Sequence, residues 1–187
     1  TLSASNVGLP YLPPLPQGTF YYAPSGLTDL TYRGNGLTSL PTIPVSMVHL
    51  DLAHNALTAL PILPDGLSTL DISNNPFASF PLLPDTLFLL QADSCDFTSI
   101  NQPLNHLSIL SLVGSQLTGL PPLPDSLWSL DIRNSTSVTC LPILPQALHY
   151  LAAANTGVTG RPNIQRNVDL GTTWGSTPIT WNSANSP

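Results

Sequence analysis

Residues 47–66 read MVHLDLAHNALTALPILPDG, and the same pattern recurs along most of the chain. Within it, Leu50 stands three residues after Met47 and two before Leu52, and the unit closes on Leu-Pro-x-Leu-Pro at residues 60–64. The counterparts of Leu50 are spaced twenty residues apart at Leu30, Leu50, Leu70, Leu90, Leu110 and Leu130, with the next at Leu151. A fixed period of this length is the signature of a repeat architecture in which each unit packs on its neighbours.

Each unit contains the signals of a short coil rather than of a helix. The residues around the key leucine alternate as on a β-strand with one buried face. The Leu-Pro-x-Leu-Pro run favours an extended return segment, and Pro64-Asp65-Gly66 is typical of the turn into the next strand. The sequence therefore predicts a solenoid with a parallel β-sheet on its concave side, an extended, polyproline-II-like convex side and little or no α-helix.

A polar position follows the key leucine by five residues in the coils. Its occupants are Asn35, Asn55, Asn75, Cys95 and Ser115. A short polar side chain at this place can bond backbone groups where the chain turns away from the strand. Cys95 lies in this column and Cys140 lies on the return side two units later, whereas the Cα atoms of a disulfide must come within about 7 Å. We therefore predict two unpaired thiols.

The composition agrees with this fold and excludes several classes of protein. The 187 residues include 21 Pro, and all four basic residues are Arg while all ten acidic residues are Asp. Without the helix formers Lys and Glu, a helical bundle or an ordinary α/β enzyme is disfavoured. A net charge of −6 with scattered Arg provides no basic footprint for nucleic acid. No apolar run approaches the roughly 20 residues that span a bilayer, so we do not expect a membrane-spanning protein.

The pattern resembles that of leucine-rich repeats, with about seven repeats over residues 27–160. It is most similar to the short bacterial type, of about 20 residues, with Leu-Pro-x-Leu-Pro returns. One group with such repeats comprises effector proteins of enteric pathogens, in which the repeats bind host targets and can precede a ubiquitin-ligase domain. The other comprises secreted proteins of Bacteroidetes, in which Thr-Cys-Leu-Pro, here residues 139–142, often interrupts the run. The sequence resembles the second group more.

The two ends of the chain depart from the repeat. Residues 9–16 read like one return segment, so residues 1–26 are expected to form an N-terminal cap with a partial repeat. Residues 161–187 are expected to form a C-terminal cap and tail, with Trp174 and Trp181 covering the last coil, because terminal repeats require caps.

Stacked strands would align the residues between the leucines into columns on the concave face, about 4.8 Å apart. The resulting apolar cluster consists of Phe88, Leu89, Ile109, Val113 and Trp128, and the acidic one of Asp51, Asp71 and Asp93, beside His49. Exposed apolar side chains on a rigid concavity are typical of an interface core, so we predict ligand binding by both clusters. Neighbouring carboxylates can bind Ca²⁺, but we interpret these as soluble strand residues. We expect no metal, no cofactor and no catalytic residue, because no nucleophile stands with a base and an orienting partner.

Two turns also carry short modification motifs. Thr86 follows Asp85 and Ser126 follows Asp125, and each is followed by Leu. This pattern resembles the O-glycosylation sequon of exported Bacteroidetes proteins, which implies glycosylation at Thr86 and Ser126.

The sequence and its resemblance together favour a recognition module without enzymatic activity. We expect it to be exported, extracellular or on the bacterial cell surface, and to bind protein or glycan through its concave face. One alternative is a self-assembling surface protein, a fibre or sheath subunit, since little charge opposes the association of copies. Another is the substrate-recognition part of a pathogen effector.

Overall fold

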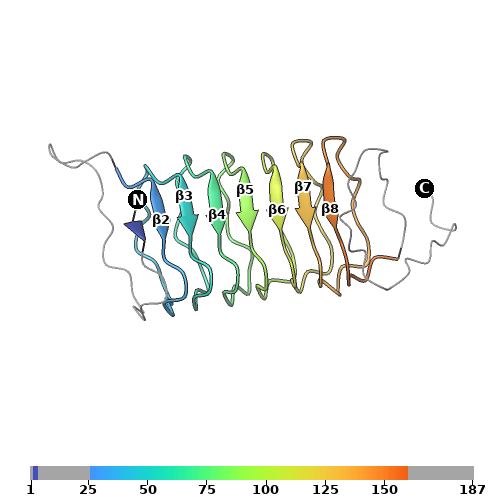
Figure 1. Ribbon diagram of the computed structural model, residues 1–187, viewed down its shortest axis with the longest axis horizontal. Helices are drawn as coiled ribbons and strands as arrows, with labels where there is room; N and C mark the ends of the chain where they lie inside the picture. The colour runs from blue at the N-terminus through green and yellow to red at the C-terminus, as the bar shows by residue number, and fades with distance from the viewer. Residues whose placement is uncertain (1, 4–25, 160–187) are drawn as a thin grey trace.

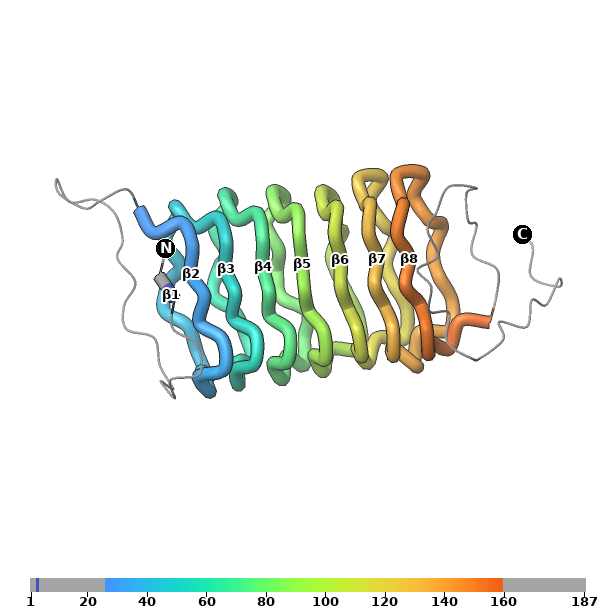
Figure 2. Tube along the Cα trace, in the orientation of Figure 1, coloured from blue at the N-terminus to red at the C-terminus, as the bar shows by residue number. Residues whose placement is uncertain are grey.

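The computed structural model describes residues 2–3 and 26–159, whose strands form one parallel sheet (Figure 1). Its eight strands follow one another in chain order: β1 Leu2–Ser3, β2 Asp29–Thr31, β3 His49–Asp51, β4 Thr69–Asp71, β5 Leu89–Gln91, β6 Ile109–Ser111, β7 Ser129–Asp131 and β8 Tyr150–Ala152. Each coil returns behind the sheet without a helix anywhere in the described residues (Figure 2). The predicted solenoid is thereby confirmed.

The register of the sheet follows the repeat of the sequence. Leu50 is the Cα partner of both Leu30 and Leu70, and the later key leucines pair in the same way. The longer sixth unit does not disturb this register, because Leu130 still pairs with Leu151. Identical positions therefore lie side by side from β2 to β8, as the columns of the sequence required.

Strand β1 adds a strand to the sheet that the sequence period did not reveal. Leu2 pairs with Leu30 although 28 residues, not 20, separate the two leucines. Ten residues after Leu2 the sequence reads LPPLP at 12–16, as it does ten residues after Leu110 at 120–124. The other residues of the predicted N-terminal cap, 1 and 4–25, lie outside the described residues, and so does the whole C-terminal cap at 161–187.

The core is formed by the inward leucines of successive coils. Leu50, Leu52, Leu57 and Met47 are all buried, and each contributes to a single apolar cluster that continues through the stack. The turns between coils are closed by backbone bonds such as that from the Leu67 N–H to the Pro64 carbonyl, at 3.0 Å. Because each coil covers one face of the next, burial of the leucines holds the solenoid together along its length.

The polar column is a second structural element inside the coil. The amide nitrogen of Asn75 donates to the carbonyls of Leu52 at 3.0 Å, Ile72 at 2.9 Å and Ser73 at 3.3 Å. Its side-chain oxygen accepts the Leu57 N–H at 3.0 Å. Asn75 is buried, so one side chain satisfies backbone groups of two successive coils that water cannot reach.

Cys95 occupies the same column with a weaker set of bonds. Its Sγ faces the Ile72 carbonyl at 3.5 Å, and burial raises the pKa of the thiol to about 11, against a smaller opposing effect of the Asn75 N–H. Cys140 is exposed on the return side, and both cysteines are free, which confirms the prediction of two unpaired thiols.

The raised pKa of Cys95 predicts a loss of stability at alkaline pH. Above pH 9.0 the unfolded chain releases the thiol proton while the folded chain retains it until about pH 11. The stabilisation is thus complete below pH 9.0 and is lost as the pH rises, by about 1.4 kcal/mol at pH 10. In urea unfolding at neutral pH and at pH 10, the wild-type chain should lose this much more stability than Cys95→Ser. Cys140→Ser should behave like the wild-type chain, and equal losses in all three proteins would contradict the prediction.

The chain leaves each strand from β2 to β8 through a residue in the left-handed region. This column comprises Gly34, His54, Asn74, Ser94, Gly114, Asn134 and Asn155, with φ between 53° and 66°. Gly and Asn adopt this conformation at low cost, so the sequence suits the turn at five of these seven coils.

Candidate functional site

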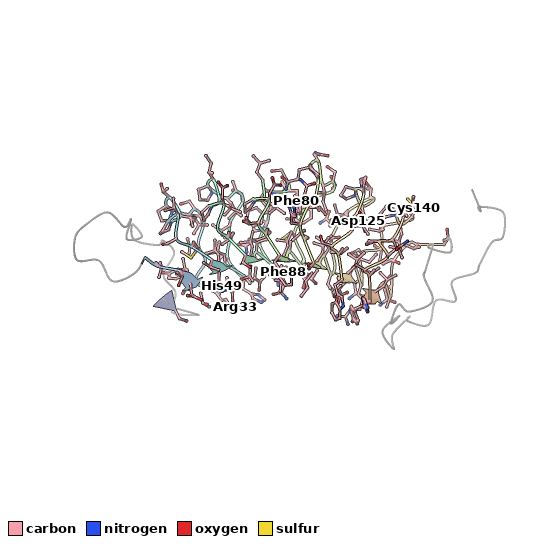
Figure 3. All side chains as sticks on the ribbon, turned by 90° about the horizontal axis from the view of Figure 1, so that it is seen from above. Arg33, His49, Phe80, Phe88, Asp125 and Cys140 are labelled. Carbon is pink, nitrogen blue, oxygen red and sulfur yellow. The ribbon has the colours of Figure 1, made fainter. Side chains whose placement is uncertain are left out.

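The concave surface is built from the residues on either side of the buried key leucines. The strand residues Leu89 and Ile109 are Cα partners in β5 and β6, and both are half-buried. In Figure 3 the labelled Arg33, His49 and Phe88 lie on the strand side of the solenoid, whereas Phe80, Asp125 and Cys140 lie on the return side. Of the predicted binding residues, Phe88 therefore lies on the strand side, and the strands themselves carry Asp51, Asp71, Leu89 and Ile109.

Two aromatic side chains project from this face in the column next to the strands. Phe88 is 48 % exposed and Trp128 is 50 % exposed. Ser108 lies between them, since its N–H donates to the Phe88 carbonyl at 2.9 Å and its carbonyl accepts the Trp128 N–H at 2.8 Å. Two coil spacings, about 10 Å, therefore separate the backbones that carry the aromatic rings, and a small residue leaves the space between them open.

Trp128 is held in place from one side by a neighbouring ring. The rings of Trp128 and His149 are stacked, with centroids 5.7 Å apart and planes inclined by 20°. The imidazole is itself fixed, because its Nδ1 lies 2.6 Å from the Ala147 carbonyl oxygen. A ring that is already ordered loses less side-chain entropy when it binds a ligand.

The acidic cluster is bridged by an arginine. The Arg33 guanidinium lies 3.0 Å from Asp51 Oδ2 and 3.3 Å from Asp71 Oδ2. The other oxygen of each carboxylate accepts a backbone N–H two residues later, from Ala53 at 3.1 Å and from Ser73 at 2.9 Å. Each of these two carboxylates therefore bonds the backbone just after its own strand, β3 or β4, and both also form ion pairs with Arg33.

Asp93 is separate from the other two carboxylates. Its Oδ1 accepts the Ser111 hydroxyl at 2.6 Å and the Val113 N–H at 2.8 Å, so it bonds the coil that follows it. Val113, predicted as part of the apolar cluster, is half-buried beside this carboxylate. The second described arginine, Arg133, binds Asp131 through two nitrogens, and this carboxylate raises the pKa of Arg133.

A shallow hollow of about 350 Å³ lies over the amino-terminal half of the concave face. It is lined by Arg33, His49, Asp51, Thr69, Asp71, Leu89 and Gln91, among others. Within it, His49 Nδ1 and Thr69 Oγ1 form a hydrogen bond of 2.9 Å. Leu89 belongs to both the hollow and the apolar cluster, so the polar and apolar halves of the surface are continuous.

The described part of the chain contains no group of three or more His, Cys, Asp or Glu side chains arranged to hold a metal ion. Within these same residues there is also no helix of the length and apolarity needed to cross a membrane. Arg33 was not predicted from the sequence as a residue of this site. Its column lies beside that of Asp51 and Asp71, so the opposite charges in neighbouring columns could have predicted the ion pairs.

Both residues of the predicted glycosylation motifs are exposed at turns. The Thr86 hydroxyl donates to the carbonyls of Asp65 and Leu67, and the Ser126 hydroxyl donates to the Leu107 carbonyl at 2.9 Å. Each hydroxyl thus bonds the backbone of the preceding coil, and glycosylation at either residue remains a prediction.

Comparison with solved structures identifies the architecture. YopM of Yersinia pestis, described as a leucine-rich effector protein, matches with a TM-score of 0.69 and 27 % identity over 88 % of this chain and 51 % of that one. YopM of Yersinia enterocolitica matches with a TM-score of 0.51 and 28 % identity, covering 80 % and 42 % of the two chains. This chain has the leucine-rich-repeat fold. It spans about half the length, or less, of these two YopM structures.

A Shigella effector leucine-rich-repeat domain shares the fold, with a TM-score of 0.58 and 22 % identity over 81 % of this chain and 67 % of that domain. No protein-family model matches the sequence, and no curated protein matches it either. The neighbours are bacterial effectors, and the leucine-rich-repeat solenoid is typically a non-enzymatic scaffold for protein interactions.

Proposed function

We propose that this chain is the recognition module of an exported bacterial protein and binds a protein ligand through its concave face. The observation that carries the proposal is the pair of half-exposed aromatic residues, Phe88 and Trp128, above the half-buried aliphatic pair Leu89 and Ile109. Aromatic side chains on a preordered surface are the typical centre of a protein interface.

The polar half of the surface supports orientation of the ligand rather than chemistry. Asp51 and Asp71 both form ion pairs with the Arg33 guanidinium, so the negative charge in the hollow is partly neutralised. Such a network contributes to the specificity of an interface more than to its affinity. The apolar cluster is accordingly the part of the surface from which we expect most of the binding energy.

The double substitution Leu89→Asp/Ile109→Asp tests this proposal. Placing two carboxylates at the centre of the apolar cluster should remove capture of the ligand protein, because both would be desolvated in the interface. The chain is immobilised, and proteins captured from host-cell and bacterial-surface extracts are identified by mass spectrometry. We expect a specific protein to be captured by the wild-type chain and lost with the double variant.

Val45→Asp is the matched control, because it introduces a carboxylate at an aliphatic residue that is 87 % exposed at a turn, outside the concave face. It should retain the captured protein, and circular dichroism should show that all variants remain folded. Identical capture by the wild-type chain and the double variant would refute binding at the concave cluster.

A second function, the substrate-recognition part of a pathogen effector, is favoured by the likeness to the YopM structures. Export, surface location and closeness to the Bacteroidetes proteins are supported by the Thr-Cys-Leu-Pro run at residues 139–142 and by the motifs at Thr86 and Ser126. A ubiquitin-ligase domain in the same polypeptide would favour the effector, whereas a carboxy-terminal sorting domain would favour the surface protein.

A further inference from the structure

The return side of the solenoid carries a row of apolar side chains that project into solvent. They occupy the middle position of the Leu-Pro-x-Leu-Pro run, where Ile62 is 93 %, Leu82 is 83 % and Ile143 is 80 % exposed, and Pro122 is exposed in the same column. We call these four residues the return ridge. Gln102 occupies this column between Leu82 and Pro122, where its side chain donates to the Pro81 carbonyl and accepts the Leu83 N–H. The four apolar side chains contribute nothing to the core, so their exposure on one side of the solenoid indicates a surface used for binding.

An acidic row runs beside the return ridge. Asp65, Asp85 and Asp125 are exposed at the turns that follow the return segments. Both described arginines, Arg33 and Arg133, lie on the strand side and bond aspartates there. Within residues 26–159 the return side therefore has exposed carboxylates and no Lys or Arg to neutralise them.

The two rows meet in a groove between the return segments at residues 120–124 and 141–145. This groove has a volume of about 570 Å³ and is lined by Pro122, Leu123, Asp125, Pro142, Ile143, Leu144, Pro145 and Gln146. Its volume falls in the range of pockets that enclose a small ligand or a large side chain. In Figure 3 Asp125 lies on the side of the solenoid opposite Phe88, so this groove is distinct from the concave surface.

We propose that the return ridge and the acidic row form a second docking surface, which binds a basic amphipathic segment of a partner protein. The apolar side of that segment would lie on Leu82, Pro122 and Ile143, with one large side chain in the groove. Its Lys or Arg residues would face Asp85 and Asp125. Charge complementarity selects this occupant over a second copy of the chain, because two copies would bring acidic rows together.

A short synthetic peptide of Leu and Lys, arranged as an amphipathic helix, is the probe for this surface. Its affinity for the full chain is measured by fluorescence anisotropy at low and high salt. Leu82→Asn/Ile143→Asn should weaken binding roughly tenfold or more by removing apolar contact. Asp85→Asn/Asp125→Asn should weaken it several-fold at low salt and remove most of the salt dependence.

Three controls make the result specific to the return ridge. Val45→Asn changes an equally exposed aliphatic residue, at 87 %, in a coil that lacks the turn aspartate, and it should leave affinity unchanged. The concave variant Leu89→Asp/Ile109→Asp should also bind the peptide normally, so this surface can succeed or fail independently of the proposed function. A peptide with Glu in place of Lys should not bind.

Two outcomes would overturn the proposal. One is equal binding of the Lys peptide to the wild-type chain and to Leu82→Asn/Ile143→Asn. The other is dimerisation of the wild-type chain in light scattering that the same variant abolishes, because the ridge would then belong to a second copy.

Discussion

Replacing Asn75 by Ala is expected to lower the free energy of unfolding by about 2 kcal/mol or more. The substitution leaves the carbonyls of Leu52, Ile72 and Ser73 and the Leu57 N–H without the amide that now bonds them. Each carbonyl keeps a second donor: Leu52 has the Asn55 amide, Ile72 the Cys95 thiol and Ser73 the His54 N–H. The buried Leu57 N–H loses its acceptor, which costs about 1–3 kcal/mol, and the lost bonds to the carbonyls add to this. Urea unfolding followed by circular dichroism measures the loss.

Asn105→Ala is the matched control for this prediction. Asn105 is exposed at a turn, where its amide bonds only the Asp85 carboxylate at 3.2 Å, so its replacement should change stability by less than about 0.5 kcal/mol. If Asn75→Ala were no more destabilising than Asn105→Ala, the polar column would not be a stabilising element of the coil.

The second large effect is expected for Phe97→Ala, at about 3–5 kcal/mol of lost stability. Phe97 is fully buried, and its ring meets that of Phe80 edge-to-face, with centroids 5.1 Å apart and planes at 88°. Removing the ring leaves a cavity between coils and also ends an aromatic contact of about 0.5–1.5 kcal/mol. Thermal and urea unfolding should both report the change.

Phe88→Ala makes the same chemical change nine residues earlier, on the concave surface. Because that ring is half exposed, its loss should cost less than about 1 kcal/mol of stability while weakening capture of the ligand protein. A comparable destabilisation by Phe88→Ala and Phe97→Ala would mean that Phe88 belongs to the core, which would contradict its assignment to the binding surface.

The fold could be predicted from the sequence because the period of the repeat determines the register of the sheet. Residues one period apart in the sequence become neighbours on adjacent strands. Leu50 pairs with Leu30 and Leu70 in space since the two coils that connect these leucines are each twenty residues long. The prediction did not include β1, because its partner Leu30 lies 28 residues away and the regular period does not reach it.

The columns of the concave face were also predictable, but the links between side chains were not. Leu89 and Ile109 lie side by side as expected. The long Arg33 side chain, however, reaches across two coils to Asp71, and Asp93 turns away toward Val113. Register determines which Cα atoms are neighbours, whereas rotamers and competing backbone donors determine which partner a carboxylate bonds.

The register has a practical consequence for studying recognition by this protein. Phe88 and Trp128 are 40 residues apart in the sequence, yet only Ser108 lies between them on the surface. The surface is thus a discontinuous epitope, to which each coil contributes a few adjacent residues. No linear peptide from the chain reproduces it, so a ligand or antibody specific for this face should recognise the folded solenoid and not its fragments.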